Sequence, residues 1–289
     1  MLPPYYAALV LSLILARLTM QNHYMMYSKA WTRESLASHM MMVHNLFLKY
    51  RYSIDAPCWT VAAEWQLYLL FPLVLLPIWR RFGIPALLGV SAALSLLPFL
   101  CGADAVNYHS WYIFIFALGM CGAAIQYHDR LQEKRWRKNI SWSKIALWLY
   151  AAFGLLCIAD FALHNHLIWE YIPNWKRFCG YELLAGTACV ALMVYGGQRL
   201  HEATDRHPSM VIRFLSHPWL TLIGMFSYSH YLVHFPILFT IRWLTLLMRM
   251  PSTYVIFIMY FVAIPISLTA GYLFFLLVEK RFLPSHLRK

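Results

Sequence analysis

Residues 56–79 read APCWTVAAEWQLYLLFPLVLLPIW, and from residue 60 onward they have the length and composition of a membrane-spanning helix. A helix needs about 20 consecutive, mostly apolar residues to cross the hydrocarbon core of a bilayer. Glu64 is the one charged residue in the quoted stretch. The stretch therefore predicts a transmembrane helix over residues 60–79 that carries a single acidic side chain.

Similar apolar runs recur along the whole chain. Of its 289 residues, 61% are hydrophobic and 12% are charged, whereas soluble domains carry about 25% charged residues. The runs are too long and too continuous for the alternating strands of a membrane barrel. We therefore expect an all-α fold, a polytopic integral membrane helical bundle of about eight helices in one domain over residues 1–289. The spans that accompany 60–79 are 3–20, 84–101, 109–126, 145–164, 179–197, 219–240 and 253–277.

The positive charge of the chain predicts its orientation. The formal net charge is +12, and Lys and Arg accumulate in cytoplasmic loops of membrane proteins. If Met1 is cytoplasmic, the cytoplasmic loops hold about twice as many basic residues as the other side, with the densest run at 130–144. We therefore expect a multi-pass protein of the inner cell membrane with both termini in the cytoplasm. The charge is then no indication of nucleic-acid binding.

The segment 21–56 lies outside the membrane in this topology. Its stretch SLASHMMMVHNLFLKY, residues 35–50, is typical of an amphipathic helix at the membrane interface. The six cysteines of the chain form no CxxC pair, so they indicate no metal site.

Two spans carry polar side chains that are costly to bury in hydrocarbon. In the span 60–79, Glu64 has Tyr68 one helical turn later and Trp59 shortly before it. An intramembrane acid normally faces a partner or a water-filled cavity. One alternative is that Glu64 pairs with Arg51 and only fixes the topology.

The second polar group is the decapeptide SYSHYLVHFP at residues 227–236. Ser227, Tyr231 and His234 share one helical stripe, and His230 lies four residues before His234. These groups either satisfy hydrogen bonds between helices or line a cavity for reaction or transport. A zinc site is not indicated, because the HExxH motif and a third ligand are absent. A serine-hydrolase GxSxG motif is also absent.

Together, these segments resemble a known family. APCWTVAAEWQLYLLFPL (56–73) and GMFSYSHYLVHFPI (224–237) are similar to two signatures of the membrane acyltransferase-3 family, and LVEKRF (277–282) resembles its closing segment that contains a glutamate. The resemblance covers essentially the whole chain. It implies transfer of an acyl group, usually acetyl, from acyl-CoA to a hydroxyl group of a cell-surface carbohydrate or lipid-linked sugar. Acyl-CoA is then a co-substrate, and no bound cofactor is expected.

The resemblance also implies differences at the front of the chain. The family has about ten helices, and residues 1–20 resemble its third, so the essential histidine of the family's first helix has no counterpart here. Three explanations stay open: a start codon further upstream, a non-catalytic remnant, or chemistry carried by other residues. A transporter or flippase for a lipid-linked sugar is a further alternative.

The resemblance and the chemistry together give a set of candidate site residues. Acyl transfer to a hydroxyl group needs a general base and hydrogen-bond donors for the developing oxyanion. We expect Ser227, Tyr228 and His234 to line the cavity where donor and acceptor meet, and Glu64 to orient the acceptor or a catalytic histidine. His234 matches a different family position from the essential histidine. The candidate substrate-binding residues are Trp59, Tyr68 and Tyr231.

Overall fold

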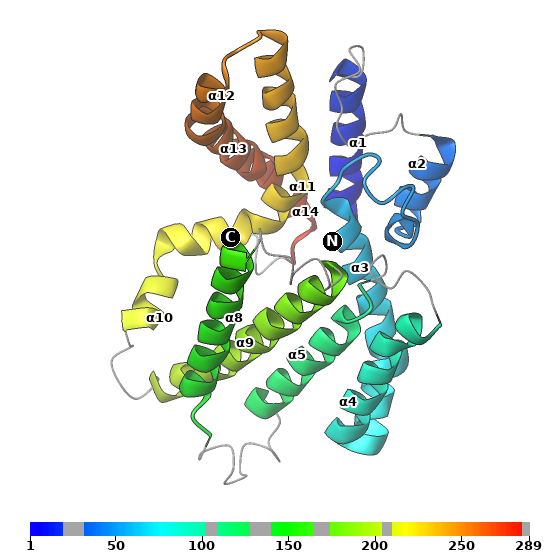
Figure 1. Cartoon of the computed structure of the whole chain (residues 1–289), viewed down its shortest axis with the longest axis vertical. Helices are drawn as coiled ribbons and strands as arrows, with labels where there is room; N and C mark the ends of the chain where they lie inside the picture. The colour runs from blue at the N-terminus through cyan, green and yellow to red at the C-terminus, as the bar shows by residue number, and fades with distance from the viewer. Residues whose placement is uncertain (20–31, 102–108, 128–139, 164–173, 204–209, 285–289) are drawn as a thin grey trace. The chain divides into compact units, whose positions relative to one another are not determined.

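The structure is a computed structural model of the chain, and it describes residues 1–19, 32–101, 109–127, 140–163, 174–203 and 210–284. Every regular element within these ranges is helical (Figure 1). The expectation of an all-α fold is therefore confirmed.

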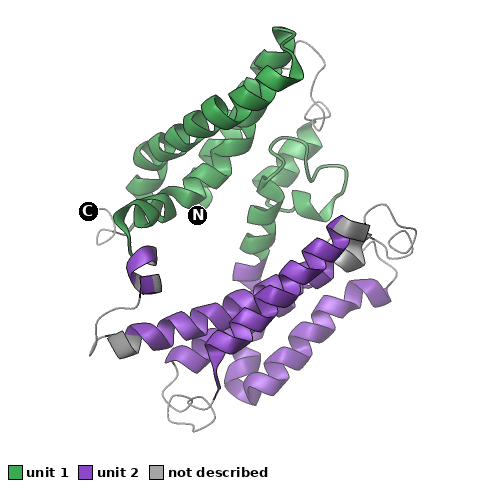
Figure 2. Ribbon diagram, turned by 60° about the vertical axis from the view of Figure 1, so that its left-hand side comes forward, with its two compact units in different colours: residues 1–66, 215–289 green, residues 67–214 purple. Residues whose placement is uncertain are grey.

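The chain forms two compact units, shown in different colours in Figure 2. Unit 1 contains Met1–Gln66 and Leu215–Lys289, and unit 2 contains Leu67–Phe214. The first boundary falls inside helix α3, Cys58–Leu70. Unit 1 therefore combines the beginning and the end of the chain, which are the two parts that carry the family-like motifs.

Unit 1 is assembled around α11, which packs against both α1 and α13. Its core joins α1, α3 and α11 through Tyr5, Cys58, Val61, Leu232 and Val233. The other helices of unit 1 lie before α3 or after α11. The elements are α1 (Leu2–Thr19), α2 (Arg33–Met40), α11 (Pro218–Leu247), α12 (Ser252–Ile258), α13 (Ile264–Phe274) and α14 (Lys280–Phe282), with π-helical turns at Met259–Ala263 and Phe275–Glu279.

Unit 2 is a row of helices in which α4 packs on α5, α5 on α9 and α9 on α8. Its core contains Leu75, Leu87, Ala117 and Cys121. The helices are α4 (Leu76–Leu100), α5 (Tyr112–Tyr127), α8 (Trp142–Leu163), α9 (Asn174–Ala203) and α10 (Met210–Leu215), with a π-helical turn at Phe71–Leu75 between α3 and α4.

The two spans predicted at 60–79 and 84–101 lie in one helical run, Cys58–Leu100. The run is interrupted at Gly83, whose φ of 81° and ψ of −173° are not helical. Only glycine adopts this region of backbone space without strain, because it has no Cβ. The break therefore lies between the two predicted spans.

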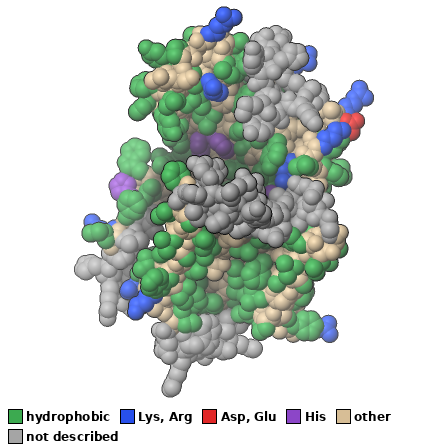
Figure 3. Space-filling view, in the orientation of Figure 1, with side chains coloured by type: hydrophobic (Ala, Val, Ile, Leu, Met, Phe, Trp, Pro, Cys, Tyr) green, Lys and Arg blue, Asp and Glu red, His purple; other side chains and the backbone are tan. Residues whose placement is uncertain are grey.

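Five helices of the described chain are long and apolar enough to cross a membrane. They are Cys58–Leu100, Trp142–Phe161, Cys179–Leu200, Pro218–Leu247 and Ser252–Phe282, and shorter apolar helices cover Leu2–Leu18 and Tyr112–Tyr127. Figure 3 shows a surface on which hydrophobic side chains dominate and charged side chains are few. These features support a multi-pass membrane protein, while the number of eight crossings and the orientation stay predictions.

The segment 35–50 does not form the single amphipathic helix that its sequence suggests. Helix α2 ends at Met40, and a short 3₁₀ turn follows at His44–Leu46. Met42 between them has a φ of 55°. The segment buries polar side chains, including Ser38, His39 and Asn45, so its role is to pack within unit 1 through polar contacts.

Candidate active site

The site begins at the turn that leads into α3. The Cys58 amide donates a hydrogen bond to the Asp55 carbonyl oxygen at 3.1 Å, and the Thr60 amide donates to the Pro57 carbonyl oxygen at 3.2 Å. The Thr60 hydroxyl also donates to the Pro57 oxygen, at 3.0 Å. Proline suits the first turn of a helix, because an amide hydrogen there has no helical partner. The turn fixes Trp59 and Thr60 at the start of the motif helix.

Tyr231 joins the two motifs, although 171 residues separate it from Thr60. Its hydroxyl group donates to the Pro57 carbonyl oxygen at 2.9 Å and lies in hydrogen-bonding contact with the Thr60 hydroxyl. Glu64, one turn beyond Thr60, is close enough to act electrostatically on the Tyr231 hydroxyl. The structure therefore brings Thr60, Glu64 and Tyr231 to one place in unit 1.

His234 follows one turn later on α11. Its Nδ1 lies 2.7 Å from the Tyr231 carbonyl oxygen, and the two rings are 5.6 Å apart. Because a carbonyl oxygen can only accept, this contact assigns the hydrogen to Nδ1. The lone pair is then on Nε2. His234 is half-buried and has the tautomer that a general base needs.

His230 has a different environment, although its ring is 5.7 Å from that of His234. Its Nδ1 donates to the Ser267 carbonyl oxygen on α13 at 3.3 Å. A Cβ on Gly271 would lie 2.8 Å from the His230 Cα, so α11 and α13 approach closely here. His230 therefore ties two helices together.

The other predicted site residues on α11 are Tyr228 and Ser227. Tyr228 is half-buried, and its hydroxyl group donates to the Met1 carbonyl oxygen at 3.0 Å. Ser227 is exposed and donates to the Gly224 carbonyl oxygen within its own helix at 2.8 Å. Tyr228 thus contacts α1, while the described contact of Ser227 is local. A catalytic role for either residue stays a prediction.

The remaining predicted residues lie on α3. The Arg51 guanidinium group lies 5.5 Å above the Trp59 ring, an arrangement typical of a cation–π contact. Arg51 is buried and donates to the Asn45 carbonyl oxygen from Nε and Nη2, at 3.3 and 3.0 Å. Tyr68 is exposed and lies one turn after Glu64, in the part of α3 that belongs to unit 2.

Sequence reasoning did not identify a second polar contact inside the membrane helices. Ser229 is fully buried and its hydroxyl group donates to Oε2 of Glu279. Glu279 ends the π-helical turn Phe275–Glu279, and such turns are frequent near functional sites. Two features of the sequence could have indicated this contact. Glu279 belongs to the closing segment that resembles the family, and Ser229 lies in the decapeptide 227–236.

The segment before α3 is held to unit 1 by polar contacts. Tyr5 and Tyr6 of α1 donate to the carbonyl oxygens of His39 and Met40, at 3.1 and 2.9 Å. Gln66 of α3 donates to Asn45 Oδ1 at 2.8 Å and to the Met42 carbonyl oxygen at 3.0 Å. Residues 32–57, named here the cap, therefore contact both α1 and α3.

The cap contains buried titratable groups. The rings of His39 and His44 stack 3.7 Å apart. Burial lowers the pKa of His39 to about 4 and that of His44 to about 3, so both are neutral at pH 7. Burial raises the pKa of Asp55 to about 7. Within the residues that the structure places, no cluster of three or more His, Cys, Asp or Glu could hold a metal ion.

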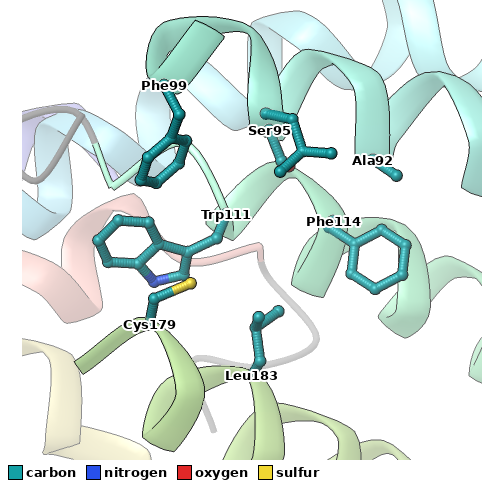
Figure 4. Close-up of a pocket in the computed structure, with 8 residues that line it drawn as sticks. Ala92, Ser95, Phe99, Trp111, Phe114, Cys179 and Leu183 are labelled. Atoms are coloured by element: carbon teal, nitrogen blue, oxygen red, sulfur yellow. The ribbon is translucent and has the colours of Figure 1, made fainter. Parts of the chain in front are cut away.

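Unit 2 contains an apolar cavity of about 370 Å³ between α4, α5 and α9 (Figure 4). Trp111 forms its central wall, with Phe99 on one side and Cys179 on the other. Glu182 fixes this wall, because it accepts a hydrogen bond from Trp111 Nε1 and another, at 3.1 Å, from the Tyr112 hydroxyl. The lining suits a hydrocarbon chain. It comprises Ala92, Ser95, Leu96, Phe99, Trp111, Phe114, Cys179 and Leu183.

Comparison with known proteins gives one match. The family model of the acyltransferase-3 family, described as an acyltransferase domain, matches residues 1–276. No curated protein and no solved structure matches the chain. The matched region contains α1, α3 and α11 and every predicted site residue. Because the match covers far more than half of the chain, this protein is a member of the acyltransferase-3 family and a membrane acyltransferase.

Proposed function

We propose that the protein transfers an acyl group, typically acetyl, from acyl-CoA to a hydroxyl group of a cell-surface carbohydrate or lipid-linked sugar. One observation carries the proposal: the Tyr231 hydroxyl lies on the Pro57 carbonyl oxygen and beside Thr60, one turn before His234. This contact joins the two motifs that resemble family signatures. It gathers a base, two hydroxyl groups and the Glu64 carboxyl group in unit 1.

The proposed step is direct acyl transfer. The acceptor oxygen attacks the thioester carbonyl carbon, and His234 Nε2 takes the acceptor proton. A carbon–oxygen bond forms, the carbon–sulfur bond breaks, and the proton passes to the CoA thiolate as it leaves. The Thr60 hydroxyl group turns away from the Pro57 carbonyl oxygen to donate to the oxyanion during attack, while the Tyr231 hydroxyl group stays on the Pro57 oxygen. Glu64 orients the acceptor hydroxyl group.

The donor and the acceptor are assigned from family resemblance and charge. The basic residues Arg80 and Arg81 precede the break at Gly83, on the side predicted to be cytoplasmic. Basic residues there attract the phosphate groups of CoA. The acceptor lies on the opposite side in this topology, where the Trp59 ring offers an aromatic surface for a sugar.

The test uses purified full-length protein in lipid nanodiscs with radiolabelled acetyl-CoA and an extract of lipid-linked sugars. We expect His234→Ala to lower kcat by about a hundredfold or more, the usual effect of losing a general base. Glu64→Gln is expected to raise KM for the acceptor and to lower kcat. Thr240→Ala is the matched control, because the Thr240 hydroxyl contacts only the carbonyl oxygen of Pro236 within α11.

Three outcomes would contradict the proposal. Wild-type rates in both His234→Ala and Glu64→Gln would remove the site from the reaction. A folded wild-type protein that consumes no acyl-CoA would instead favour a non-catalytic member of the family. Movement of a lipid-linked sugar across the bilayer without acyl-CoA would favour a flippase.

A further inference from the structure

Asp55 lies where α1 meets the start of α3, and its carboxyl group is almost completely buried. Its exposed fraction is 1%. Ser12 of α1 donates a hydrogen bond to Oδ2 at 3.0 Å, and the Asp55 carbonyl oxygen accepts the Cys58 amide hydrogen at 3.1 Å. Asp55 therefore links α1 to the first turn of α3 through both its side chain and its backbone.

This carboxyl group is costly to keep buried. Among the residues that the structure places, no Lys or Arg forms an ion pair with Asp55, and besides Ser12 its carboxyl group has the Cys58 thiol, a weak hydrogen-bond donor, as a neighbour. Asparagine would occupy the same volume without the cost of burying an ionisable group. Buried, strongly perturbed acids are most frequent at functional sites. The burial of Asp55 therefore favours a role at the candidate active site.

The turn that begins at Asp55 also contains Pro57, which contacts two residues of the candidate active site. Two residues later, the Pro57 carbonyl oxygen accepts hydrogen bonds from the hydroxyl groups of Thr60 and Tyr231. The titratable groups that face Asp55 are Tyr5 of α1, Cys58 of α3 and Tyr231 of α11. Asp55 thus lies at the one point of unit 1 where the three helices that form the site meet.

We propose that Asp55 is a positioning residue for the reaction: through Ser12 its carboxyl group fixes the turn 55–58, and this turn holds the Tyr231 hydroxyl group in place at the start of α3. The functional part of this inference rests on the proposed acyl transfer. When the hydrogen bond between Ser12 and Asp55 is lost, the start of α3 is free to move. The Pro57 carbonyl oxygen then no longer lies in a fixed position relative to the Tyr231 hydroxyl group. Asp55 itself is buried and does not touch substrate.

The accessibility of Cys58 reports on this turn without reference to activity. Cys58 is fully buried, so we expect a maleimide to leave it unmodified in the wild-type protein, as judged by peptide mass spectrometry. Ser12→Ala removes the link and leaves the Asp55 carboxyl group beside the Cys58 thiol, and loss of one such hydrogen bond is expected to raise Cys58 labelling about tenfold. Asp55→Ala removes the link as well, together with the contact between the carboxyl group and the thiol. Asp55→Asn still accepts a hydrogen bond from Ser12 and should keep Cys58 protected.

Cys121 is the matched internal control. It is buried in the core of unit 2, so its labelling should not change in any of these variants. Equal increases at Cys58 and Cys121 would show general unfolding and would overturn a local link. Protection of Cys58 in Asp55→Ala would overturn it as well.

The activity of the same variants tests the role in the reaction. We expect Asp55→Ala to lower kcat and to leave KM for acyl-CoA unchanged. Asp55→Asn should keep kcat at neutral pH, and its pH profile should lack the ionisation that Asp55 contributes in the wild-type protein. Wild-type kcat in Asp55→Ala, or an unchanged pH profile in Asp55→Asn, would overturn the positioning role. Absence of acyl transfer by folded wild-type protein would overturn the proposed function, while Cys58 labelling decides separately whether Asp55 holds the turn.

Discussion

His230 and His234 show how neighbouring residues of one motif receive different roles from their contacts. Both lie on α11, and in both the Nδ1 faces a backbone carbonyl oxygen. The partner of His230 belongs to another helix, at Ser267, whereas the partner of His234 is Tyr231 on the same helix. His230 therefore contributes to packing between helices, whereas the described hydrogen bond of His234 stays within α11.

This difference predicts opposite effects of two alanine substitutions. His230→Ala should lower the melting temperature, because it removes a hydrogen bond between helices worth about 1 kcal/mol, and it should leave KM for acyl-CoA unchanged. His234→Ala should leave the melting temperature nearly unchanged and lower kcat by about a hundredfold or more. Melting of purified protein in detergent and the acyl-transfer rate measure the two effects. The reverse pattern, with a stable but inactive His230→Ala protein, would exchange the two roles.

Asp55 predicts a pH dependence of stability. Burial raises its pKa from 3.8 to about 7, so the folded state holds this proton more tightly than the unfolded state. The contribution of Asp55 to the free energy of unfolding should therefore fall as pH rises from about 4 to about 7 and then level off. The shift corresponds to about 4 kcal/mol as an upper limit.

Asp55→Asn removes this contribution, so the difference in stability between the variant and the wild-type protein should change with pH. We expect the variant to melt at a higher temperature than the wild-type protein above pH 7 and at a similar temperature near pH 4. The measurement is a series of melting curves across this range for both proteins. Parallel curves would show that Asp55 is ionised in the folded protein throughout. His39 and His44 have pKa values lowered from 6.5 to about 4 and 3, so in both proteins they raise the free energy of unfolding as pH rises over much of the same range. The difference between the two proteins therefore isolates the contribution of Asp55.

At the residue scale, the sequence shows which side chains are unusual but not what they contact. Glu64, Tyr231 and His234 stood out because polar groups are rare in apolar spans. Asp55 lies in a connecting segment, where an acid normally faces water, and nothing in the residues beside it indicates that it is buried. Its burial depends on Ser12 and Cys58, which only the fold brings together.

Among the elements, the break at Gly83 is the feature that sequence reasoning located best. Arg80 and Arg81 separate two apolar runs, and Gly83 follows two residues after Arg81. The π-helical turns, in contrast, were not predicted, because an apolar run has the same composition whether or not it contains an extra residue in one turn. The end of α2 at Met40 was also missed, since its apolar spacing continues through residue 50.

Substitution of glycine by alanine at two positions of α4 tests the break. Gly83 has a positive φ, and alanine there should cost about 1–3 kcal/mol through backbone strain alone, because the nearest atom to an added Cβ is Pro85 Cδ at 3.8 Å. Gly89 lies in the same helix with no atom within 4 Å of an added Cβ. Gly89→Ala should therefore be neutral or stabilising. Equal melting temperatures of the two variants would argue against the break at Gly83.

At the scale of the whole molecule, the chain has two compact units, and the candidate active site and the apolar cavity belong to different ones. Hydropathy predicts each membrane span separately. It therefore predicted the helices but could not predict how they divide between the two units. The single domain over residues 1–289 remains a prediction. Unit 1 contains the second motif segment, 224–237, and the part of the first motif segment from residue 56 to residue 66.

The orientation of the molecule in the membrane is predicted from charge alone and has a direct test. With Met1 in the cytoplasm, Cys101 at the end of α4 faces outward, and Phe82 beside the break at Gly83 faces the cytoplasm. Both side chains are exposed in the structure. In intact cells, a membrane-impermeant maleimide should label Cys101 but not the cysteine of Phe82→Cys, which should react only after the cells are opened.

The buried Cys121 serves as the negative control, because it should stay unlabelled in both conditions. Labelling of Phe82→Cys in intact cells, with Cys101 protected, would reverse the topology. Arg80 and Arg81 would then face outward, away from cytoplasmic acyl-CoA, and the proposed donor site would lose its electrostatic basis. The same experiment therefore decides whether acyl-CoA can approach unit 2 from the side on which the cell produces it.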